Sequence, residues 1–282
     1  MLAISKVNIE IKENSFLNTL DIFNFKPKIS ILIETGSYIL KTADSYQELL
    51  SSFKLRHEVF FKEFQGNESE GIDIDKFDSH FDHLVIIDKA TNNVVGTYRL
   101  SSSEFSTFSY TAQEFELCEI YKMKGPHLEL GRACIHKEFR IGVIISLLWR
   151  GIIEYMNQSG ANVLFGCSSI KVNNPKDTAI VYKYLLEQGH VAVENFTTPT
   201  SMYQMPYFDI WFSYYSCNKL TDFQCQEAER LIPSLVKSYL KLGAKIASIP
   251  AFDKEFDCID VLTVLKKEDV ANSVARRFQM VQ

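Results

Sequence analysis

The stretch that decides the fold is Leu128–Ile135, which reads Leu-Glu-Leu-Gly-Arg-Ala-Cys-Ile. Its apolar residues predict an extended strand, yet the stretch also carries Glu129 and Arg132. A charged pair in such a strand is costly to bury unless the charges are paired or used. The pattern therefore predicts a polar site set into an apolar core.

An acidic cluster lies upstream, at Asp73-Ile74-Asp75-Lys76-Phe77-Asp78, and His80, Asp82 and His83 follow it. The spacing of its aspartates superficially resembles a calcium loop, but Phe77 and Asp78 occupy the fifth and sixth positions, and a glycine is needed at the sixth. The two histidines with Asp82 could begin a metal site, but the sequence holds no second cluster to complete the coordination. We therefore expect no metal, and we expect His83 to be a hydrogen-bonded residue at the start of a strand.

Composition is typical of an ordinary globular protein, with 46% hydrophobic and 23% charged residues in a chain of 282. The net charge of −5 argues against a general nucleic-acid binder, which would show a basic stripe. The six cysteines form no Cys-x-x-Cys pair, and charged residues interrupt the first apolar stretch, so we expect a reduced, cytoplasmic protein. The longest near-apolar run, Ile141–Trp149, is too short to span a bilayer. Peripheral contact with the inner membrane stays open.

Hydrophobic periodicity predicts helices and strands in mixed order, which is typical of an α+β domain with a mixed, mainly antiparallel sheet. We expect an N-terminal lead at 1–30, a main domain at 31–220, and an extension at 221–282 that packs on it. The predicted helices are 45–64, 142–157, 178–188, 222–243 with an interruption at Pro233, and 268–278. A strand or a strand pair is predicted at 31–40, and further strands are predicted at 81–88, 94–100, 128–135, 163–167, 208–215, 246–251 and 259–265.

A set of short motifs follows in fixed order between residues 45 and 265. It consists of Leu55-Arg56-His57-Glu58-Val59-Phe60, Asp73-x-Asp75-x-Phe77-Asp78, Phe81-Asp82-His83-Leu84, Val95-Gly96-Thr97-Tyr98-Arg99-Leu100, Glu129-Leu130-Gly131-Arg132, Leu147-Leu148-Trp149-Arg150-Gly151, Phe165-Gly166-Cys167-Ser168-Ser169, Tyr239-Leu240-Lys241-Leu242-Gly243-Ala244 and Pro250-Ala251-Phe252-Asp253. The ordered set resembles the bacterial acyltransferases that make lyso-ornithine lipid, often labelled hemolysin-like. The resemblance implies transfer of a fatty acyl group, such as a 3-hydroxy fatty acyl group, from acyl carrier protein to the α-amine of L-ornithine.

That family is similar in fold to the GNAT acyltransferases and to the synthases of acyl-homoserine lactones. The resemblance therefore implies a GNAT-like sheet flanked by helices. In the synthases the pattern is an arginine ahead of a Val-Phe pair, an Asp-x-x-Asp, an arginine closing a strand, and a Glu-x-x-Arg. The matching residues in this chain are Arg56, Phe60, Asp75, Asp78, Arg99, Glu129 and Arg132.

One stretch departs from ordinary GNAT enzymes, whose glycine-rich loop holds the pyrophosphate of CoA at a helix N-terminus. The equivalent stretch here is Arg140-Ile141-Gly142-Val143-Ile144-Ile145, which keeps one glycine. A phosphopantetheine arm on a carrier protein lacks that pyrophosphate. The departure favours an acyl-phosphopantetheine donor on acyl carrier protein over acyl-CoA, with no permanently bound cofactor.

Amide formation from a thioester needs a neutral amine, and an α-amine has a pKa of about 8, so a modest base suffices. Glu129 is the candidate base, directly or through a water. Arg132 and Arg99 are candidates for orienting Glu129 or the substrate carboxylate, although Glu129 and Arg132 could instead form a buried structural ion pair. The remaining candidates are substrate-binding residues: Arg56, Phe60, Asp75, Asp78 and His83. Asp75 and Asp78 could either bind ammonium groups of the substrate or fix Arg56 and Arg99.

Other residues admit a functional and a structural interpretation. Cys134 and His136 share a face of a strand and could act as nucleophile and base, but a lone buried cysteine is more often a small apolar side chain. Trp149 could line the acyl chain, yet a core position is favoured. The loop with Phe105, Phe108 and Phe115 could cover an acyl tunnel.

Three alternatives to ornithine acylation stay open. The acceptor could be another amino acid, such as glycine or lysine. The product could be an acyl-homoserine lactone, which needs a site for S-adenosylmethionine. In a different class, the chain could be a non-catalytic module that binds a lipid or an acyl carrier protein.

Overall fold

The computed structural model describes residues 22–270, and the chain forms two compact units. Unit 1 comprises the described residues up to Phe108 together with Leu130–Ser159. Unit 2 comprises Ser109–Glu129 together with the described residues from Gly160 onward. Strand β5 (His127–Ile135) passes from unit 2 into unit 1 directly after Glu129, so Glu129 and Arg132 belong to different units.

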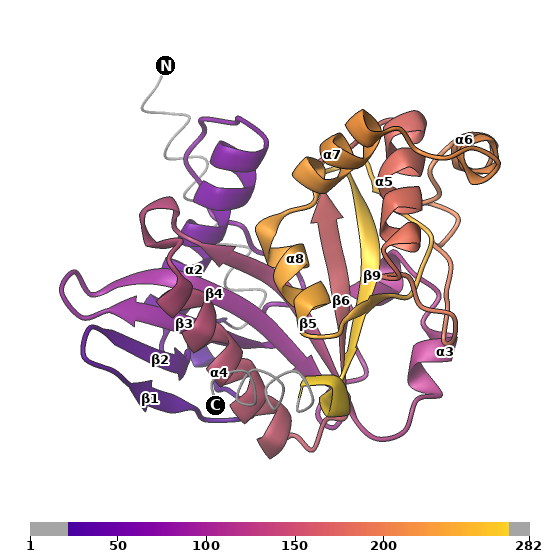
Figure 1. The fold of residues 1–282 in the computed structure, drawn as a ribbon. Helices are drawn as coiled ribbons and strands as arrows, with labels where there is room; N and C mark the ends of the chain where they lie inside the picture. Colours follow the sequence, from indigo (N-terminus) through magenta and orange to yellow (C-terminus); the bar gives the residue numbers. More distant parts are fainter. Residues whose placement is uncertain (1–21, 271–282) are drawn as a thin grey trace, which may run out of the picture. The chain divides into compact units, whose positions relative to one another are not determined.

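Unit 1 is built on antiparallel strands that pair in chain order (Figure 1). Leu40 of β2 lies opposite Ile86 of β3, and Leu84 of β3 lies opposite Tyr98 of β4. The strands are β1 (Leu32–Glu34), β2 (Tyr38–Thr42), β3 (Asp82–Asp88), β4 (Asn93–Ser102) and the second half of β5.

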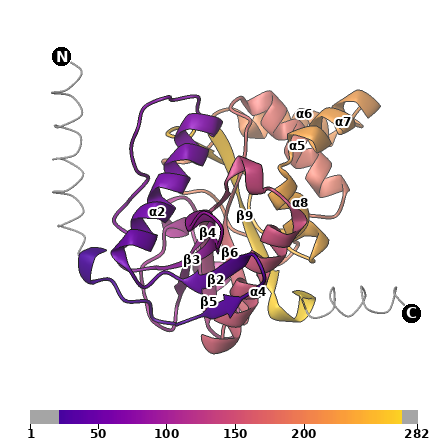
Figure 2. The same cartoon turned by 90° about the vertical axis from the view of Figure 1, so that its left-hand side faces the viewer.

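Helices α2 and α4 cover opposite faces of this sheet (Figure 2). Side chains alternate along β3, so neighbouring residues of this strand point to different helices. Val85 belongs to an apolar cluster with Phe53 of α2. Its neighbour Leu84 points the other way, to α4, where a Cβ on Gly151 would lie 2.6 Å from Leu84 Cδ2. The helical segments of unit 1 are the short η1 (Ile22–Asn24), α2 (Tyr46–His57), the π-helix η2 (Glu58–Phe64), the short η4 (Lys137–Phe139) and α4 (Gly142–Gln158).

The strands of unit 2 are arranged around β6. β6 pairs in parallel with the first half of β5 and antiparallel with β9 (Figure 1). In this register Phe165 of β6 lies opposite Glu129 of β5 and opposite Val264 of β9. The strands are β6 (Val163–Ile170), β7 (Lys245–Ile246), β8 (Ala251–Asp253) and β9 (Cys258–Lys266), with β7 and β8 both paired to β9.

The two faces of the unit 2 sheet have different covers. On one, which we call the Phe165 face, Phe165 clusters with Phe115 and Leu117 from the segment that precedes β5. The other face packs against helix α5 through Ile170 and Val261. The helical segments of unit 2 are η3 (Thr111–Gln113), α3 (Cys118–Tyr121), α5 (Pro175–Glu187), α6 (Phe208–Ser216), α7 (Asp222–Leu231) and α8 (Ser234–Lys241).

The prediction of a strand at 208–215 is wrong, because these residues form helix α6. Its aromatic residues favour strands in isolation, but here they stack one helical turn apart. The rings of Phe208 and Phe212 lie 5.4 Å apart, and those of Trp211 and Tyr215 lie 6.3 Å apart. Packing on α5 through Tyr182 therefore decides the conformation of this segment.

Most of the other described elements follow the sequence-based predictions. The strand or strand pair expected at 31–40 is the pair β1 and β2, whereas the short segments η1, η3, α3 and η4 were not predicted. The strand expected at 246–251 is two short strands, β7 and β8, at its two ends. The closing helix expected at 268–278 begins within the described residues, at 267–270, and the rest of it lies outside them. The expected α+β class with a mixed, mainly antiparallel sheet is confirmed.

The domain limits expected at residues 30 and 220 stay predictions. Antiparallel pairing of β9 with β6 supports treating 221–282 as an extension of the main fold. Most of the lead at 1–30 lies outside the described residues. Among residues 22–270, no helix is both long and apolar enough to cross a lipid bilayer.

Candidate active site

The aspartates of the acidic cluster hold a buried arginine in unit 1. Arg56, on α2, is fully buried, and its Nε donates to Asp73 Oδ2 at 2.7 Å. Its Nη1 and Nη2 donate to the two carboxylate oxygens of Asp78 at 2.8 and 3.1 Å. Burial alone would lower the pKa of Arg56, but Asp73 and Asp78 outweigh burial and raise it. Arg56 is therefore a permanent cation.

Two further arginines close this group into a ring. Arg99, at the end of β4, lies 2.7 Å from Asp75 Oδ1 and 3.0 Å from Asp78 Oδ1. Arg132, on β5, lies 3.1 Å from Asp73 Oδ2 and 3.2 Å from Asp75 Oδ2. Each aspartate thus bridges two guanidinium groups. We call this group the arginine–aspartate ring; its members are Arg56, Asp73, Arg132, Asp75, Arg99 and Asp78.

Charges in the ring balance, with three arginines facing three aspartates. Burial alone would raise the pKa of Asp78, but Arg56 and Arg99 outweigh burial and hold that pKa far below its usual range. Burial alone would also raise the pKa of Asp73, but Arg56 and Arg132 outweigh burial and lower it. The carboxylates of Asp73 and Asp78 are therefore ionised at neutral pH, and all three aspartates contact guanidinium groups.

Backbone strain on β5 aims Arg132 at the ring. Arg132 has φ of 48°, in the left-handed region that non-glycine residues rarely adopt. Such a conformation costs about 1–3 kcal/mol and persists where the surroundings impose it. Arg132 follows Gly131 in a strand that is otherwise extended. Its left-handed conformation breaks the regular alternation of side chains where the chain enters unit 1.

His83 is a structural residue of unit 1. Its ring is buried between Phe25 and Phe53, and Nε2 lies 2.9 Å from the carbonyl oxygen of Asp78. Burial lowers the pKa of His83 to about 4, so the ring is neutral at physiological pH. This is the hydrogen-bonded residue that the sequence predicts at a strand start, and it supports the loop that carries Asp78.

Asp82 and His80, which were considered as the start of a metal site, make different contacts, and Phe60 lies on another element. Asp82 accepts hydrogen bonds from the backbone N–H groups of Lys28 and Ile29 and from Tyr155 Oη. His80 stacks on Phe108. Phe60 is half-buried on the π-helix η2.

Glu129 is buried in unit 2, where Thr111 fixes its carboxylate. The backbone N–H and the hydroxyl of Thr111 each donate to Glu129 Oε1 at 2.7 Å. The hydroxyl of Thr111 also lies 3.8 Å from Cys167 Sγ on β6. The candidate base therefore has a fixed orientation on the Phe165 face.

A second buried charged group, which the sequence analysis missed, lies on the same face. The carboxylates of Glu114, Asp253 and Asp260 come within 4.8 Å of one another, and we call them the acid cluster. Burial, and after it the charge of Asp260, raises the pKa of Glu114 to about 9. These residues are far apart in the sequence, so no spacing reveals them. One signal was available: Asp260 interrupts an apolar strand, as Glu129 does.

Cys134 does not have the environment of a nucleophile. It is buried, and burial raises the pKa of its thiol above the ordinary range. His136 faces Glu58, with Nε2 3.5 Å from Oε1. The interpretation of Cys134 as a small apolar side chain is the better one. All six cysteines lie within the described residues, and none forms a disulfide.

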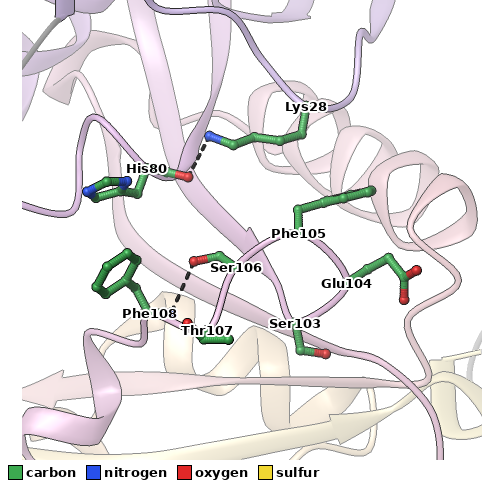
Figure 3. Close-up of a pocket in the computed structure, with 8 residues that line it drawn as sticks. All are labelled: Lys28, His80, Ser103, Glu104, Phe105, Ser106, Thr107 and Phe108. Atoms are coloured by element: carbon green, nitrogen blue, oxygen red, sulfur yellow. Dashed lines mark hydrogen bonds between the residues drawn. The ribbon is translucent and has the colours of Figure 1, made fainter.

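A pocket of about 380 Å³ opens in unit 1 beside the segment that follows β4 (Figure 3). Phe105 and Phe108, two of the three phenylalanines considered as a cover for an acyl tunnel, line this pocket. Lys28 Nζ donates to the carbonyl oxygen of His80 at its edge. Phe115 is instead part of the unit 2 core, so the three phenylalanines do not form one surface.

Comparisons with known proteins identify relatives of the chain. A family model described as "Acetyltransferase (GNAT) domain" matches residues 55–150. The L-ornithine N(alpha)-acyltransferase of Brucella abortus (strain 2308) is 30% identical over 258 residues, which is 86% of this chain and 89% of that protein. The protein of the same name from Rhodobacter capsulatus is 28% identical over 81% of this chain and 90% of that protein. Among solved structures, FeeM, an N-acyl amino acid synthase from uncultured soil microbes, has a TM-score of 0.47 at 9% identity, covering 85% of this chain and 96% of that chain.

Proposed function

The chain belongs to the family of L-ornithine N(alpha)-acyltransferases, and we propose that it forms lyso-ornithine lipid by transferring a fatty acyl group from acyl carrier protein to the α-amine of L-ornithine. The observation that carries this proposal is similarity at 30% identity over 86% of the chain. That span includes β5 and the residues of the arginine–aspartate ring. An acyltransferase of this kind needs a base, an anion-orienting group and a thioester donor.

Glu129 is the proposed base. The α-nitrogen of the acceptor attacks the thioester carbonyl, the N–C bond forms, and the C–S bond then breaks to release a thiolate. The nitrogen gives up a proton, and Glu129 accepts it directly or through a water. The proton that the nitrogen loses is passed on to this thiolate, so the net products are the amide and the free thiol. Two hydrogen bonds from Thr111 support this role, because they hold Glu129 Oε1 in one position.

The arginine–aspartate ring supports a positioning role for its carboxylates. Asp75 and Asp78 each lie between two guanidinium groups, which favours the interpretation that they fix the arginines over the interpretation that they bind ammonium. We assign Arg99 and Arg132 to orienting the acceptor carboxylate, since guanidinium groups suit carboxylates. Arg56 and His83 then hold the ring in place, and Phe60 stays a proposed contact for substrate.

The start of α4 favours a carrier-protein donor. Arg140 occupies the position expected to contact the pyrophosphate of CoA, but it is paired with Glu63. Arg140 Nη1 donates to Glu63 Oε1 at 2.5 Å, and Arg140 Nη2 donates to Glu63 Oε2 at 2.6 Å. The side chains of Ile141 and Val143 are about half exposed at the helix start. Branched apolar groups there suit a pantetheine arm better than a pyrophosphate. We place this chemistry in the cytoplasm, with peripheral membrane contact as part of the proposal.

A panel of donors and acceptors tests the proposal. Acyl carrier protein loaded with a 3-hydroxy fatty acyl group should release free thiol with L-ornithine, and acyl-CoA should react much more slowly. Glycine, lysine and S-adenosylmethionine are the competing acceptors. Thiol release with none of the amino acids would end the proposal, whereas faster turnover with another acceptor would change its substrate.

A variant of Glu129 tests the base. Glu129→Gln keeps the side-chain size and should lower kcat at neutral pH by about 100-fold or more, the usual contribution of a general base. Glu119→Gln is the matched control, because Glu119 is a carboxylate of the same unit whose side chain is 44% exposed. An unchanged kcat in Glu129→Gln, with circular dichroism showing a native fold, would remove Glu129 as the base.

A further inference from the structure

The three carboxyl groups of the acid cluster are buried close together in unit 2. Glu114, Asp253 and Asp260 are 1%, 5% and 2% exposed, and their carboxylates lie within 4.8 Å of one another. Among the described residues, neither Glu114 nor Asp253 forms an ion pair. Three carboxylates so close cannot all ionise without a cation nearby. Burial raises the pKa of Glu114 to about 9, so this carboxyl holds a proton in the free protein.

One oxygen of the cluster lacks a donor. Asp253 Oδ1 accepts from the backbone N–H groups of Glu255 and Phe256, and Asp260 Oδ1 accepts from Ser169 Oγ. Glu114 Oε2, in contrast, is buried and has no hydrogen-bond partner in the described part of the chain. Leaving a buried acceptor unpaired costs about 1–3 kcal/mol. A ligand that brings several N–H donors and a positive charge would remove both penalties.

The cluster lies on the same face as Glu129. Glu129 lies opposite Phe165, and Asp260 lies opposite Ser169, four residues further along β6 on the same face. Cys167 stands between them: burial first, and then the charges of Glu114, Asp260 and Glu129, raise the pKa of its thiol. Asp260 thus lies beside the carboxyl end of β6, and Glu129 lies at the last residue pair of the parallel ladder between β5 and β6.

We propose that Glu114, Asp253 and Asp260 bind the side-chain ammonium of the diamino acid acceptor and thereby set its α-amine toward Glu129. This inference rests on the proposed ornithine acylation. Glu129 and Asp260 are separated by four residues along β6, about 13 Å, and by two strand spacings across the sheet, about 10 Å, so their Cα atoms lie about 16 Å apart and their side chains can shorten the gap. A four-carbon chain between two nitrogens, with a hydrogen bond at each end, spans about 12 Å. An ammonium offers three donors and a positive charge, which matches the unpaired oxygen of Glu114 and the surplus of carboxylates.

The test compares ornithine with 2-aminopentanoic acid, which differs from ornithine in lacking the side-chain amine. The wild-type enzyme should prefer ornithine by at least about 100-fold in kcat/KM, because a site built for a polar group strongly rejects an analogue without it. Glu114→Gln and Asp260→Asn should each reduce that preference by about 10-fold or more, mainly by lowering kcat/KM for ornithine. Glu229→Gln, an exposed carboxylate of α7, should leave the preference unchanged.

Binding measurements separate failure of this inference from failure of the proposed function. Calorimetry without acyl donor should show ornithine binding that weakens about 10-fold in Glu114→Gln. If acyl transfer to ornithine occurs but Glu114→Gln and Asp253→Asn keep the wild-type preference and affinity, the inference is wrong and the proposed function stands. If Mg²⁺, Ca²⁺ or Mn²⁺ alone binds the wild-type protein tightly and not Glu114→Gln, the cluster is a metal site and the inference is overturned. Glu114→Gln replaces a group that is already protonated, so it should fold.

Discussion

The arginine–aspartate ring and the acid cluster are two buried charged groups with opposite balance. In the ring, three aspartates each bridge two arginines. In the acid cluster, three carboxylates face one another, and an oxygen of Glu114 has no partner among the described residues. A balanced group can be permanent structure, because each charge is compensated within the fold. An unbalanced group is stable only with added protons or with a cationic ligand, and so it marks a place for one.

The largest expected effect comes from unbalancing the ring. Arg56→Met leaves Asp73 and Asp78 buried without their main cation, and breaking a buried pair in this way costs about 3–5 kcal/mol. Urea unfolding should show that loss in the free energy of unfolding. Lys54→Met, an exposed residue of the same helix, is the control and should change stability little. A loss of less than 1 kcal/mol in Arg56→Met would mean that the ring is not a structural unit.

The second test uses pH, because the two groups should respond in opposite directions. Glu114 has a raised pKa, so between its ordinary value of 4.5 and about 9 the folded protein binds more protons than the unfolded protein. The free energy of unfolding therefore falls as pH rises through that interval. Glu114→Gln removes this loss and should be more stable than wild type by about 2 kcal/mol at pH 8, with little difference at pH 4.

The ring should show the reverse dependence. Asp73 and Asp78 have lowered pKa values, so their stabilisation is present above the ordinary aspartate range and is lost as pH falls below it. Thermal unfolding of wild type and Glu114→Gln across pH 3–9 measures both limbs. If the stability of wild type and Glu114→Gln depends on pH in the same way, Glu114 is ionised in the folded protein at neutral pH. The acid cluster and the arginine–aspartate ring would then not respond to pH in opposite directions.

A change that touches neither charged group sets the scale for packing alone. Gly151→Val places a branched side chain where even a Cβ would lie 2.6 Å from Leu84 Cδ2 and 3.0 Å from Leu40 Cδ2. Overpacking of this kind costs about 1–3 kcal/mol, independent of pH. Gly36→Ala is the control, because no atom lies within 4 Å of its added Cβ. A pH-dependent loss in Gly151→Val would show that packing in α4 is coupled to titration.

The smallest expected effect concerns Asp82, a buried carboxylate that accepts hydrogen bonds from neutral donors and has Lys28 Nζ 3.8 Å from its Oδ1. Tyr155→Phe removes one hydrogen bond, at 2.9 Å, and leaves the backbone donors of Lys28 and Ile29. The loss in the free energy of unfolding should be about 1 kcal/mol. Tyr214→Phe, an exposed tyrosine, is the control. A loss as large as that of Arg56→Met would place Asp82 with the charged groups and not with the satisfied ones.

Much of the fold follows from local pattern. Helix α4 and strands β3, β4, β6 and β9 show apolar periodicity strong enough to be predicted from sequence. The segment 208–215 shows where this fails, because its aromatic residues fit a strand by propensity and a helix by their contacts with Tyr182. The short strands β7 and β8 show a second limit, since each gains its pairing only from β9.

By itself, the sequence determined the α+β class, the costly charges of β5, and the acidic cluster upstream of them. Only the tertiary structure decided which charges meet. Asp73, Asp75 and Asp78 lie close in the chain and end between arginines from three different elements. Glu114 and Asp260 lie far apart in the chain and end side by side. The physical reason is that periodicity is a local property, whereas the partner of a buried charge is set by strand register and by segments that cross the sheet.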